Sequence, residues 1–207
     1  MAVAWGGTMF KEALLGLAMQ CAPQVHPDTI LDVARTESGL NPFAIAEIIP
    51  KKERVNGKSV ISYLPKNRDD ALSIIKNIEQ KKRRFSVGLM QITNSNYPNL
   101  HTNAELMLDP CNNLRAFQVI IKDCFLRGKT LKNAVSCYYS GNFSTGYQAE
   151  NEFRKTSYVE RIGYKKDYVV PSTKEDQKKE VETKRAVKIE SEIIYPDYVI
   201  RGIATTS

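Results

Sequence analysis

The chain has 207 residues, enough for one good-sized hydrophobic core and an extension. Its composition, 42% hydrophobic and 26% charged, is that of an ordinary globular protein, and no segment approaches the ~20 apolar residues of a membrane-spanning helix. The net charge of +7 suits an anionic partner such as nucleic acid, a membrane surface or an acidic wall polymer. The basic residues come in runs such as KKRR, 81–84, without interleaved aromatic residues. A solubilising excess of charge therefore fits equally well, and we expect no nucleic-acid partner.

The segment MFKEALLGLAMQC, 9–21, predicts the first core helix. Its apolar residues share one helical face: Phe10, Ala13, Leu14, Leu17 and Cys21. A lysine followed by a short apolar run is also typical of signal peptides, but no A-x-A-like cleavage site follows it. Gln20 before Cys21 does not fit a lipoprotein either. An export signal is therefore not evident.

The next segment, PDTILDVARTE, 27–37, predicts a helix that begins at Pro27 and Asp28 and ends before Gly39. One face of this helix carries Ile30, Val33, Ala34 and Glu37. A carboxyl group on an apolar face is desolvated, which raises its pKa and suits a general acid for glycoside cleavage. Glu37 is therefore a candidate catalytic acid. The alternative is a solvated surface group near a helix end.

The middle of the chain predicts the only β structure. After an irregular stretch, 40–58, the segment RVNGKSVISYL, 54–64, predicts a hairpin with a tight turn at Asn56-Gly57. An amphipathic helix follows over 67–84, with two aspartates in its first turn and the basic run in its last. Its expected core face is Ala71, Ile74, Ile75 and Ile78. Residues 85–93, FSVGLMQIT, form an apolar segment interrupted by a glycine and a glutamine.

Three further helices are expected in the second half. The first spans 109–128, with Asp109 as its N-cap, Pro110 as its first residue and Gly128 at its end. The second spans 130–142 and ends at Gly141, and the third, of weaker periodicity, covers 149–168. The expected faces of the first two carry Leu114, Phe117, Ile121 and Phe125, and Leu131, Ala134, Val135 and Tyr138. The predicted fold is thus α+β, mostly α-helical, in one domain over 8–168.

From about Pro171 the character of the sequence changes. The segment STKEDQKKEVETKRAVKIESE, 172–192, is dense in charge and holds no aromatic residue, so it can bury little area. We therefore expect residues 169–207 to form a charged, flexible C-terminal tail.

The four cysteines, Cys21, Cys111, Cys124 and Cys137, form no C-x-x-C pair, so neither a zinc nor a thioredoxin-type site is indicated. The even number permits two disulfides, but four buried thiols are the preferred interpretation. Cys111 and Cys124 lie roughly 20 Å apart on one predicted helix and cannot bond to each other. With two unrelated histidines and no glycine-rich phosphate loop, we expect no metal or cofactor.

Three fragments stand out together: ESGLNP at 37–42, SVGLMQIT at 86–93 and SCYYSGN at 136–142. In order and spacing they resemble the goose-type-lysozyme and lytic transglycosylase superfamily, and most closely its type IV secretion and conjugation group, over roughly residues 9–165. The resemblance implies a lysozyme-like domain in which Glu37 is the only catalytic acid. It also implies supporting or glycan-contacting roles for Ser38, Gly88, Leu89, Met90, Gln91 and Tyr138. Tyr139 departs from the family's asparagine, which leaves that substrate contact open.

The resemblance further implies a peptidoglycan lytic transglycosylase. Such an enzyme cleaves the β-1,4 bond between N-acetylmuramic acid and N-acetylglucosamine and leaves a 1,6-anhydro end. The implied place is the periplasm or cell envelope of a Gram-negative bacterium, where it opens the wall for a secretion or conjugation apparatus. The implied partners are glycan strands and, through the tail, secretion components.

Two alternatives stay open, a hydrolytic muramidase and a non-catalytic wall-binding factor. Two-carboxylate hydrolysis needs a second acid about 5–10 Å away. Four acidic residues are candidates, although none lies in a comparable motif: Glu47, Glu53, Asp69 and Asp70.

Overall fold

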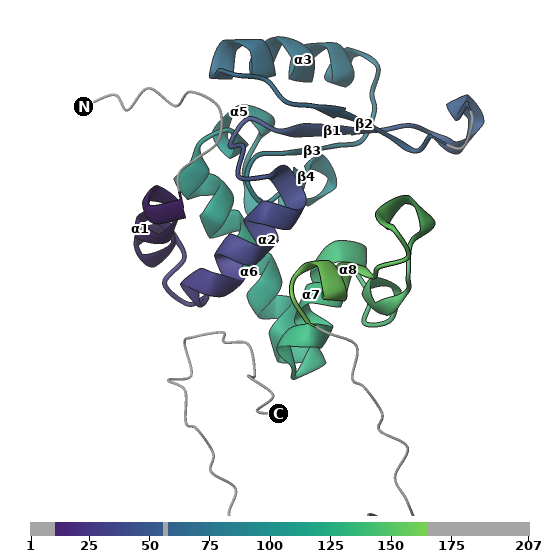
Figure 1. The fold of residues 1–207 in the computed structure, drawn as a ribbon. Coiled ribbons are helices and arrows are strands. Elements are labelled where there is room, and N and C mark those ends of the chain that lie inside the picture. The colour runs from purple at the N-terminus through teal and green to yellow at the C-terminus, as the bar shows by residue number, and fades with distance from the viewer. Residues whose placement is uncertain (1–10, 56–57, 165–207) are drawn as a thin grey trace, which may run out of the picture.

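A computed structural model describes residues 11–55 and 58–164. The α-helices are α1 (Lys11–Cys21), α2 (Pro27–Ser38), α3 (Arg68–Gln80), α4 (Tyr97–Leu100), α5 (Ala104–Met107), α6 (Pro110–Gly128), α7 (Leu131–Ser140) and α8 (Tyr158–Arg161). The 3₁₀ helices are η1 (Lys51–Glu53), η2 (Asn94–Asn96), η3 (Thr145–Tyr147) and η4 (Asn151–Phe153). The strands are β1 (Ile45–Ile48), β2 (Val60–Tyr63), β3 (Phe85–Val87) and β4 (Ile92–Thr93). The predicted α+β, mostly helical fold is confirmed (Figure 1).

Some predictions lie outside the described residues. They are the turn at Asn56-Gly57, the contribution of Phe10 to the first helix, the domain bounds at 8 and 168, and the tail over 169–207.

The helix ends follow the local chemistry that the sequence indicates. Pro27 opens α2, and Gly39 ends it in the left-handed region at φ +59°. The Asp109 side chain caps α6 by accepting from the Asn112 amide. Thr130 caps α7 in the same way, and Gly141 ends that helix. Short polar caps and left-handed stops therefore fix where three of the main helices begin or end.

The core is built around α6, which packs against α1, α5 and α7. Leu114, Phe117 and Ile121 are fully buried on its inner face, as predicted, whereas Phe125, predicted on the same face, is half-buried. The face of α1 differs from the predicted one. Its buried residues are Leu14, Ala18 and Cys21, whereas Ala13 is exposed and Leu17 half-buried. Apolar spacing alone allowed either of two overlapping faces, and docking against α6 selects the one that contains Ala18.

The strand pairing predicted for the hairpin over residues 54–64 is wrong. Strand β2 pairs with β1, in the register Ile45 to Tyr63 and Ile48 to Val60, so residues 54–55 are not its partner strand. β1 also pairs with β3, and β3 with β4, giving an antiparallel sheet in the order β2-β1-β3-β4. The central strand β1 falls in the stretch predicted to be irregular. A two-residue turn signal could not identify a partner more than ten residues upstream.

Two helix predictions are too long. The helix expected over 67–84 ends at Gln80, so the basic run follows α3 instead of filling its last turn. The helix expected over 149–168 reduces, within the described residues, to η4 and α8, with an isolated bridge between Glu150 and Thr156. A left-handed residue at Arg154, φ +53°, interrupts any continuous helix there. The short helices α4 and α5 had no sequence prediction.

Both cysteine pairs are disulfide-bonded, so the expectation of four free thiols is wrong. Cys21 at the end of α1 bonds to Cys111 at the start of α6, and Cys124 of α6 bonds to Cys137 of α7. The exclusion of a bond between Cys111 and Cys124 holds. The pairing depends on how three helices pack, which spacing along the chain does not reveal.

Candidate active site

Glu37 lies in the last turn of α2, where the helix stops. The amide of Gly39 bonds back to the Arg35 carbonyl at 3.1 Å, which closes the helix just after Ser38. The apolar residues that share the face of Glu37 are fully buried, whereas Glu37 itself is only half-buried. The carboxyl group therefore sits where an apolar helix face reaches the surface.

Burial raises the pKa of Glu37 to about 7. The hydroxyl of Tyr158 donates a hydrogen bond to Oε1 of Glu37, and the positive charge of Arg161 also acts on the carboxyl group. Both contacts lower the pKa, but they only partly offset desolvation. A carboxyl group with this pKa holds its proton near neutral pH and can still release it. The raised pKa agrees with the desolvation expected for a carboxyl group on an apolar helix face.

The segment Gly88–Gln91 forms a tight connection between β3 and β4. Gly88 has φ +85° and its amide donates to the Ala44 carbonyl at 2.9 Å. The side-chain amide of Gln91 donates to the carbonyls of Ala44 and Gly88, at 3.0 and 2.9 Å. These bonds fix the connection against the chain that follows Glu37. Leu89 and Met90 are fully buried, so their side chains belong to the core.

Asn113 of α6 holds this connection and was not singled out from the sequence. It is fully buried, and its Nδ2 donates to the carbonyls of Val87 and Met107, at 2.9 and 3.0 Å. Its Oδ1 accepts from the Met90 amide at 2.8 Å. A Cβ atom at Gly88 would lie 2.3 Å from Asn113 Nδ2. The available signal was a polar residue four positions before Phe117 on an otherwise apolar helix face.

Tyr138 of α7 joins this arrangement to the acid. Its hydroxyl donates to the Met90 carbonyl, and its ring packs edge-on against Phe117, with centroids 4.9 Å apart. Burial and the charge of Glu37 raise the pKa of Tyr138 well above its usual value, so the phenol stays protonated beside the carboxyl group. The structure thus brings Glu37, Met90 and Tyr138 together from three separate segments.

Ser38 and Tyr158 differ from the sequence-based view of the site. The Ser38 side chain is buried, and its hydroxyl donates to the Ala34 carbonyl of the same helix at 3.0 Å. Tyr158, at the start of α8, is buried and donates to Glu37, although no role is predicted for it from the sequence. The weak helical periodicity of its segment contains no local pattern that distinguishes a tyrosine contacting a distant acid.

Of the four proposed second acids, Glu47 is the most buried. It lies on β1 with no exposed surface and accepts from the Tyr63 hydroxyl at 2.7 Å and from Arg83. Burial raises its pKa, but those hydrogen bonds and the charges of Lys81 and Arg83 outweigh it and hold the pKa of Glu47 below its ordinary value. Glu47 is therefore ionised and hydrogen-bonded to Tyr63 and Arg83, whereas the pKa of Glu37 is raised.

The other three candidates have different surroundings. Glu53 shares Arg83 with Glu47, and Asp69 and Asp70 are exposed in the first turn of α3. Within the described residues, no carboxyl group is among the groups that shift the pKa of Glu37.

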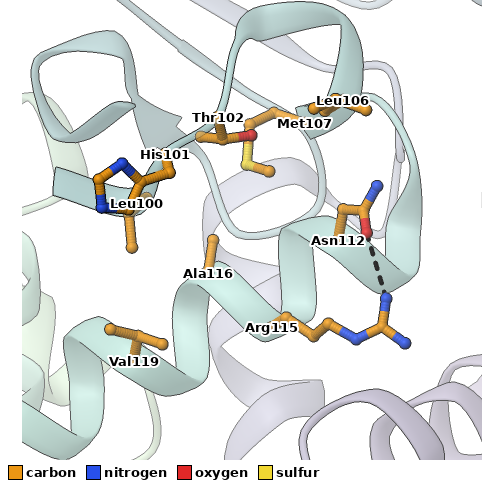
Figure 2. A pocket seen from close by; sticks show the side chains of 9 residues that line it. All are labelled: Leu100, His101, Thr102, Leu106, Met107, Asn112, Arg115, Ala116 and Val119. Atoms are coloured by element: carbon orange, nitrogen blue, oxygen red, sulfur yellow. Dashed lines mark hydrogen bonds between the residues drawn. The ribbon is translucent and has the colours of Figure 1, made fainter. Parts of the chain in front are cut away.

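A pocket of about 360 Å³ lies between α6 and the α4–α5 region. Figure 2 shows side chains of the α4–α5 region facing Asn112, Arg115, Ala116 and Val119 of α6 across it, with Arg115 bonded to Asn112 at 3.1 Å. None of the predicted site residues lines this pocket. In residues 11–55 and 58–164, no cluster of three or more His, Cys, Asp or Glu side chains is arranged to hold a metal ion. No helix in the same part of the chain is long and apolar enough to cross a membrane.

The chain is similar to known proteins over the region that contains these motifs. Residues 16–159 match the family described as Transglycosylase SLT domain. The chain is 34% identical over 157 residues to the type IV secretion system protein virB1 of Brucella abortus biovar 1, and equally to that of Brucella suis biovar 1, which covers 72% of this chain and 61% of each relative. It is 26% identical over 137 residues to protein virB1 of Agrobacterium fabrum, which covers 63% of this chain and 52% of that protein.

The chain thus spans about three fifths of the length of the Brucella proteins. No solved structure gives a significant match. The matched region contains α2 with Glu37, the connection Gly88–Gln91, α7 with Tyr138 and the start of α8. The chain therefore belongs to the Transglycosylase SLT domain family and is homologous to the virB1 proteins of type IV secretion.

Proposed function

We propose that the protein is a peptidoglycan lytic transglycosylase that cleaves the β-1,4 bond between N-acetylmuramic acid and N-acetylglucosamine. Membership of the transglycosylase family supports the class of reaction. The observation that carries the proposal is the Glu37 carboxyl group, whose pKa burial raises to about 7 while Tyr158 holds one of its oxygens. A general acid works best when its pKa lies near the operating pH.

The same carboxyl group serves both halves of the reaction. Protonated Glu37 gives its proton to the glycosidic oxygen as the bond from C1 of N-acetylmuramic acid breaks, and N-acetylglucosamine leaves with a free hydroxyl. The Glu37 carboxylate then takes the proton of the C6 hydroxyl as that oxygen bonds to C1. The proton returns to Glu37, no water is consumed, and the product carries a 1,6-anhydro ring.

The state of the other acids supports a one-carboxylate route. Inverting hydrolysis needs a second carboxylate to position water, and retaining hydrolysis needs one as a nucleophile. Glu47, the best buried of the other candidates, is bonded to Tyr63 and Arg83 and is not among the groups that shift the pKa of Glu37. The N-acetyl group of the substrate can stabilise the cationic centre in its place. The C6 hydroxyl has an advantage over water because it is already held beside the reacting carbon.

We assign the remaining site residues by their contacts. Gln91 and the backbone of the Gly88–Gln91 connection contact the glycan, since Leu89 and Met90 are buried and shape this connection from the inside. Tyr138 holds the connection through the Met90 carbonyl and keeps a protonated phenol near Glu37. Ser38 secures the end of α2 on which Glu37 is mounted.

The biological setting follows from the Brucella relatives, which are named as type IV secretion system proteins. We propose that the domain over 8–168 opens the wall locally for a secretion or conjugation apparatus in the cell envelope of a Gram-negative bacterium. Its partners are glycan strands and, through residues 169–207, secretion components. No cofactor is needed for the chemistry above.

Digestion of purified peptidoglycan in ¹⁸O-labelled water tests the reaction. We expect fragments that end in 1,6-anhydro-N-acetylmuramic acid, one water mass below reducing ends and without label. Labelled reducing ends as the main product would instead identify a muramidase. Binding to peptidoglycan without any released fragment would identify a wall-binding factor. Glu37→Gln is the control for background cleavage.

A further inference from the structure

Three residues beside the Glu37–Tyr158 pair have no role in the reaction scheme above: Tyr139, Glu150 and Arg161. We refer to them as the positioning layer. The ring of Tyr139 stacks on the ring of Tyr158, with centroids 4.3 Å apart and an angle of 12° between the planes. The Tyr139 hydroxyl donates to Glu150 Oε1 at 2.6 Å. Tyr139 belongs to α7 and Tyr158 to α8, and these two helices pack together in Figure 1. The residue that departs from the family's asparagine therefore lies directly behind the tyrosine that holds the acid.

Glu150 connects this stack to a charge. Its second oxygen, Oε2, accepts from Arg161 at 3.2 Å, and the side chains of Glu150 and Arg161 are 24% and 16% exposed. The Arg161 guanidinium lies 3.9 Å from the centre of the Phe153 ring and 5.6 Å from that of Tyr158. It also donates to the Thr156 carbonyl at 3.2 Å. A guanidinium with this many partners is held in one place, close enough to act on Glu37.

Arg161 also contacts α2. The hydroxyl of Thr36, the residue before Glu37, donates to the backbone carbonyl of Arg161 at 3.2 Å. The contacts therefore run from Glu37 through Tyr158, Tyr139 and Glu150 to Arg161, and return beside Glu37.

We propose that Tyr139, Glu150 and Arg161 are positioning residues that hold Tyr158 against Glu37 and set how much positive charge the acid experiences. This inference deepens the proposed function, because the group they position is the proposed acid. Tyr139 keeps the Tyr158 ring in place by stacking. Glu150 compensates the charge of Arg161, which would otherwise draw the proton off Glu37. The tyrosine at position 139 is thus matched to Glu150 and Arg161, and an asparagine there could not stack on Tyr158.

The charge contacts predict opposite effects for the two members of the ion pair. The described groups that shift the pKa of Glu37 are Tyr158 and Arg161 of α8, while Tyr138 of α7 is a neutral phenol beside it. Glu150→Gln leaves Arg161 uncompensated, so the titration midpoint of Glu37 should fall by roughly half to one pH unit. Arg161→Gln should raise that midpoint by a similar amount. The double variant should lie between the two.

The measurement is an NMR titration of the Glu37 carboxyl carbon in the full chain labelled with ¹³C-glutamate, with the Glu37→Gln spectrum as the assignment. Glu152→Gln is the matched control, because Glu152 is an exposed acid two residues from Glu150 and should leave the midpoint unchanged. If Arg161→Gln does not fold, two other variants replace it. Glu150→Gln should still lower the midpoint, and Arg161→Lys, which keeps the charge, should change it little. Midpoints that coincide in Glu150→Gln and the control would overturn the inference.

The stacking contact is tested by a double-mutant cycle. Tyr139→Ala removes the stack, so it should raise the Glu37 midpoint in the way that Tyr158→Phe does, whereas Tyr139→Phe keeps the ring and should raise it less. In the Tyr158→Phe background, Tyr139→Ala should add nothing, because the hydroxyl it positions is gone. An undiminished effect in that background would show that Tyr139 does not act through Tyr158.

The titration separates this inference from the proposed function, because it does not depend on activity. The pH profile of kcat/KM should follow the NMR midpoints when Glu37 is the catalytic acid. Shifted midpoints with an unchanged activity profile would uphold the positioning layer and refute the catalytic role. Unchanged midpoints would refute the layer whatever the activity does.

Discussion

The Tyr158 hydroxyl donates a hydrogen bond to Oε1 of Glu37, although 121 residues separate the two in the sequence. Tyr158 starts α8 and Glu37 lies in the last turn of α2, so the contact joins the last described helix to one near the start of the domain. Tyr158 is buried, and its own pKa is raised well above the usual value by burial and by the charge of Glu37. The Tyr158 hydroxyl therefore keeps its proton and donates it in the hydrogen bond to Glu37. The charge state of the proposed acid depends on the far end of the domain as well as on its own helix.

Replacing the proposed acid tests the catalytic assignment. Glu37→Gln should keep the fold and lower peptidoglycan cleavage by about 10²- to 10⁴-fold, because glutamine has nearly the same shape and cannot donate a suitably acidic proton. Release of anhydro fragments measures the loss, and circular dichroism checks the fold. Glu12→Gln, at an exposed position in α1, is the control and should cleave normally. Wild-type cleavage by Glu37→Gln would mean that Glu37 is structural.

The raised pKa of Glu37 predicts how stability varies with pH. The folded pKa of about 7 exceeds the ordinary value of 4.5, so the folded state holds the proton more tightly than the unfolded state. Its stabilising contribution is fully present below pH 4.5 and is lost as the pH rises through 7. Relative to Glu37→Gln, the wild-type free energy of unfolding should fall by about 3 kcal/mol between pH 4 and pH 8. Urea unfolding at several pH values measures it, and parallel curves for the two proteins would contradict it.

Removing the donor should make Glu37 a weaker acid. The Tyr158 hydrogen bond lowers the pKa of Glu37, so Tyr158→Phe should raise that pKa and move the high-pH limb of kcat/KM to higher pH. Tyr138→Phe offers a contrast, because its hydroxyl donates to the Met90 carbonyl and not to Glu37. That variant should disturb the Gly88–Gln91 connection with little movement of the pH limb. Identical pH profiles for Tyr158→Phe and the wild type would argue against this role of Tyr158.

The connection before Gln91 should not tolerate a side chain at Gly88. Gly88→Ala meets both a positive φ and a Cβ contact of 2.3 Å with Asn113 Nδ2, so we expect a loss of about 2–4 kcal/mol in the free energy of unfolding. Gly16→Ala is the matched control. Its Cβ meets nothing within 4 Å, and alanine is the better helix former, so α1 should gain about 0.5–1 kcal/mol. Denaturant midpoints compare the two, and equal changes would refute the packing argument.

The two disulfides should differ in their effect on stability. The loop closed by Cys21–Cys111 spans 90 residues and that closed by Cys124–Cys137 spans 13. In the chain-entropy description the longer loop stabilises by about 4–5 kcal/mol and the shorter by about 3 kcal/mol. Replacing each pair by alanines, with unfolding measured under oxidising conditions, tests the order. A larger loss from the Cys124–Cys137 pair would show that local packing outweighs loop entropy.

Local chemistry determined where α2, α6 and α7 begin or end. Pro27 and Gly39 bound α2, Asp109 and Pro110 start α6, and Gly141 ends α7, as their conformational preferences require. These signals operate within a few residues of the element they bound, so they can be recognised without knowing the fold. The three motifs likewise identified the family, because each is a short continuous segment.

Pairings between distant segments were decided only by the tertiary structure. β1 was predicted as irregular chain because its role as the central strand depends on β2 and β3 on either side of it. The cysteine pairs depend on how α1 and α7 pack against α6. Asn113 belongs to no motif, and two of its three hydrogen bonds to backbone groups reach Val87 and Met90, more than twenty residues away.

The candidate site divides in the same way. The sequence alone determined that a carboxyl group, Glu37, lies on an apolar helix face, because helical periodicity is a local property. The tertiary structure decided which groups surround that carboxyl group, Tyr158 and Arg161, and how far desolvation outweighs them. It also decided that Glu47 is ionised, through Tyr63 and Arg83. A pKa depends on desolvation, nearby charges and hydrogen bonds. These come from groups that are close in space, and distant parts of the sequence become neighbours only when the chain folds.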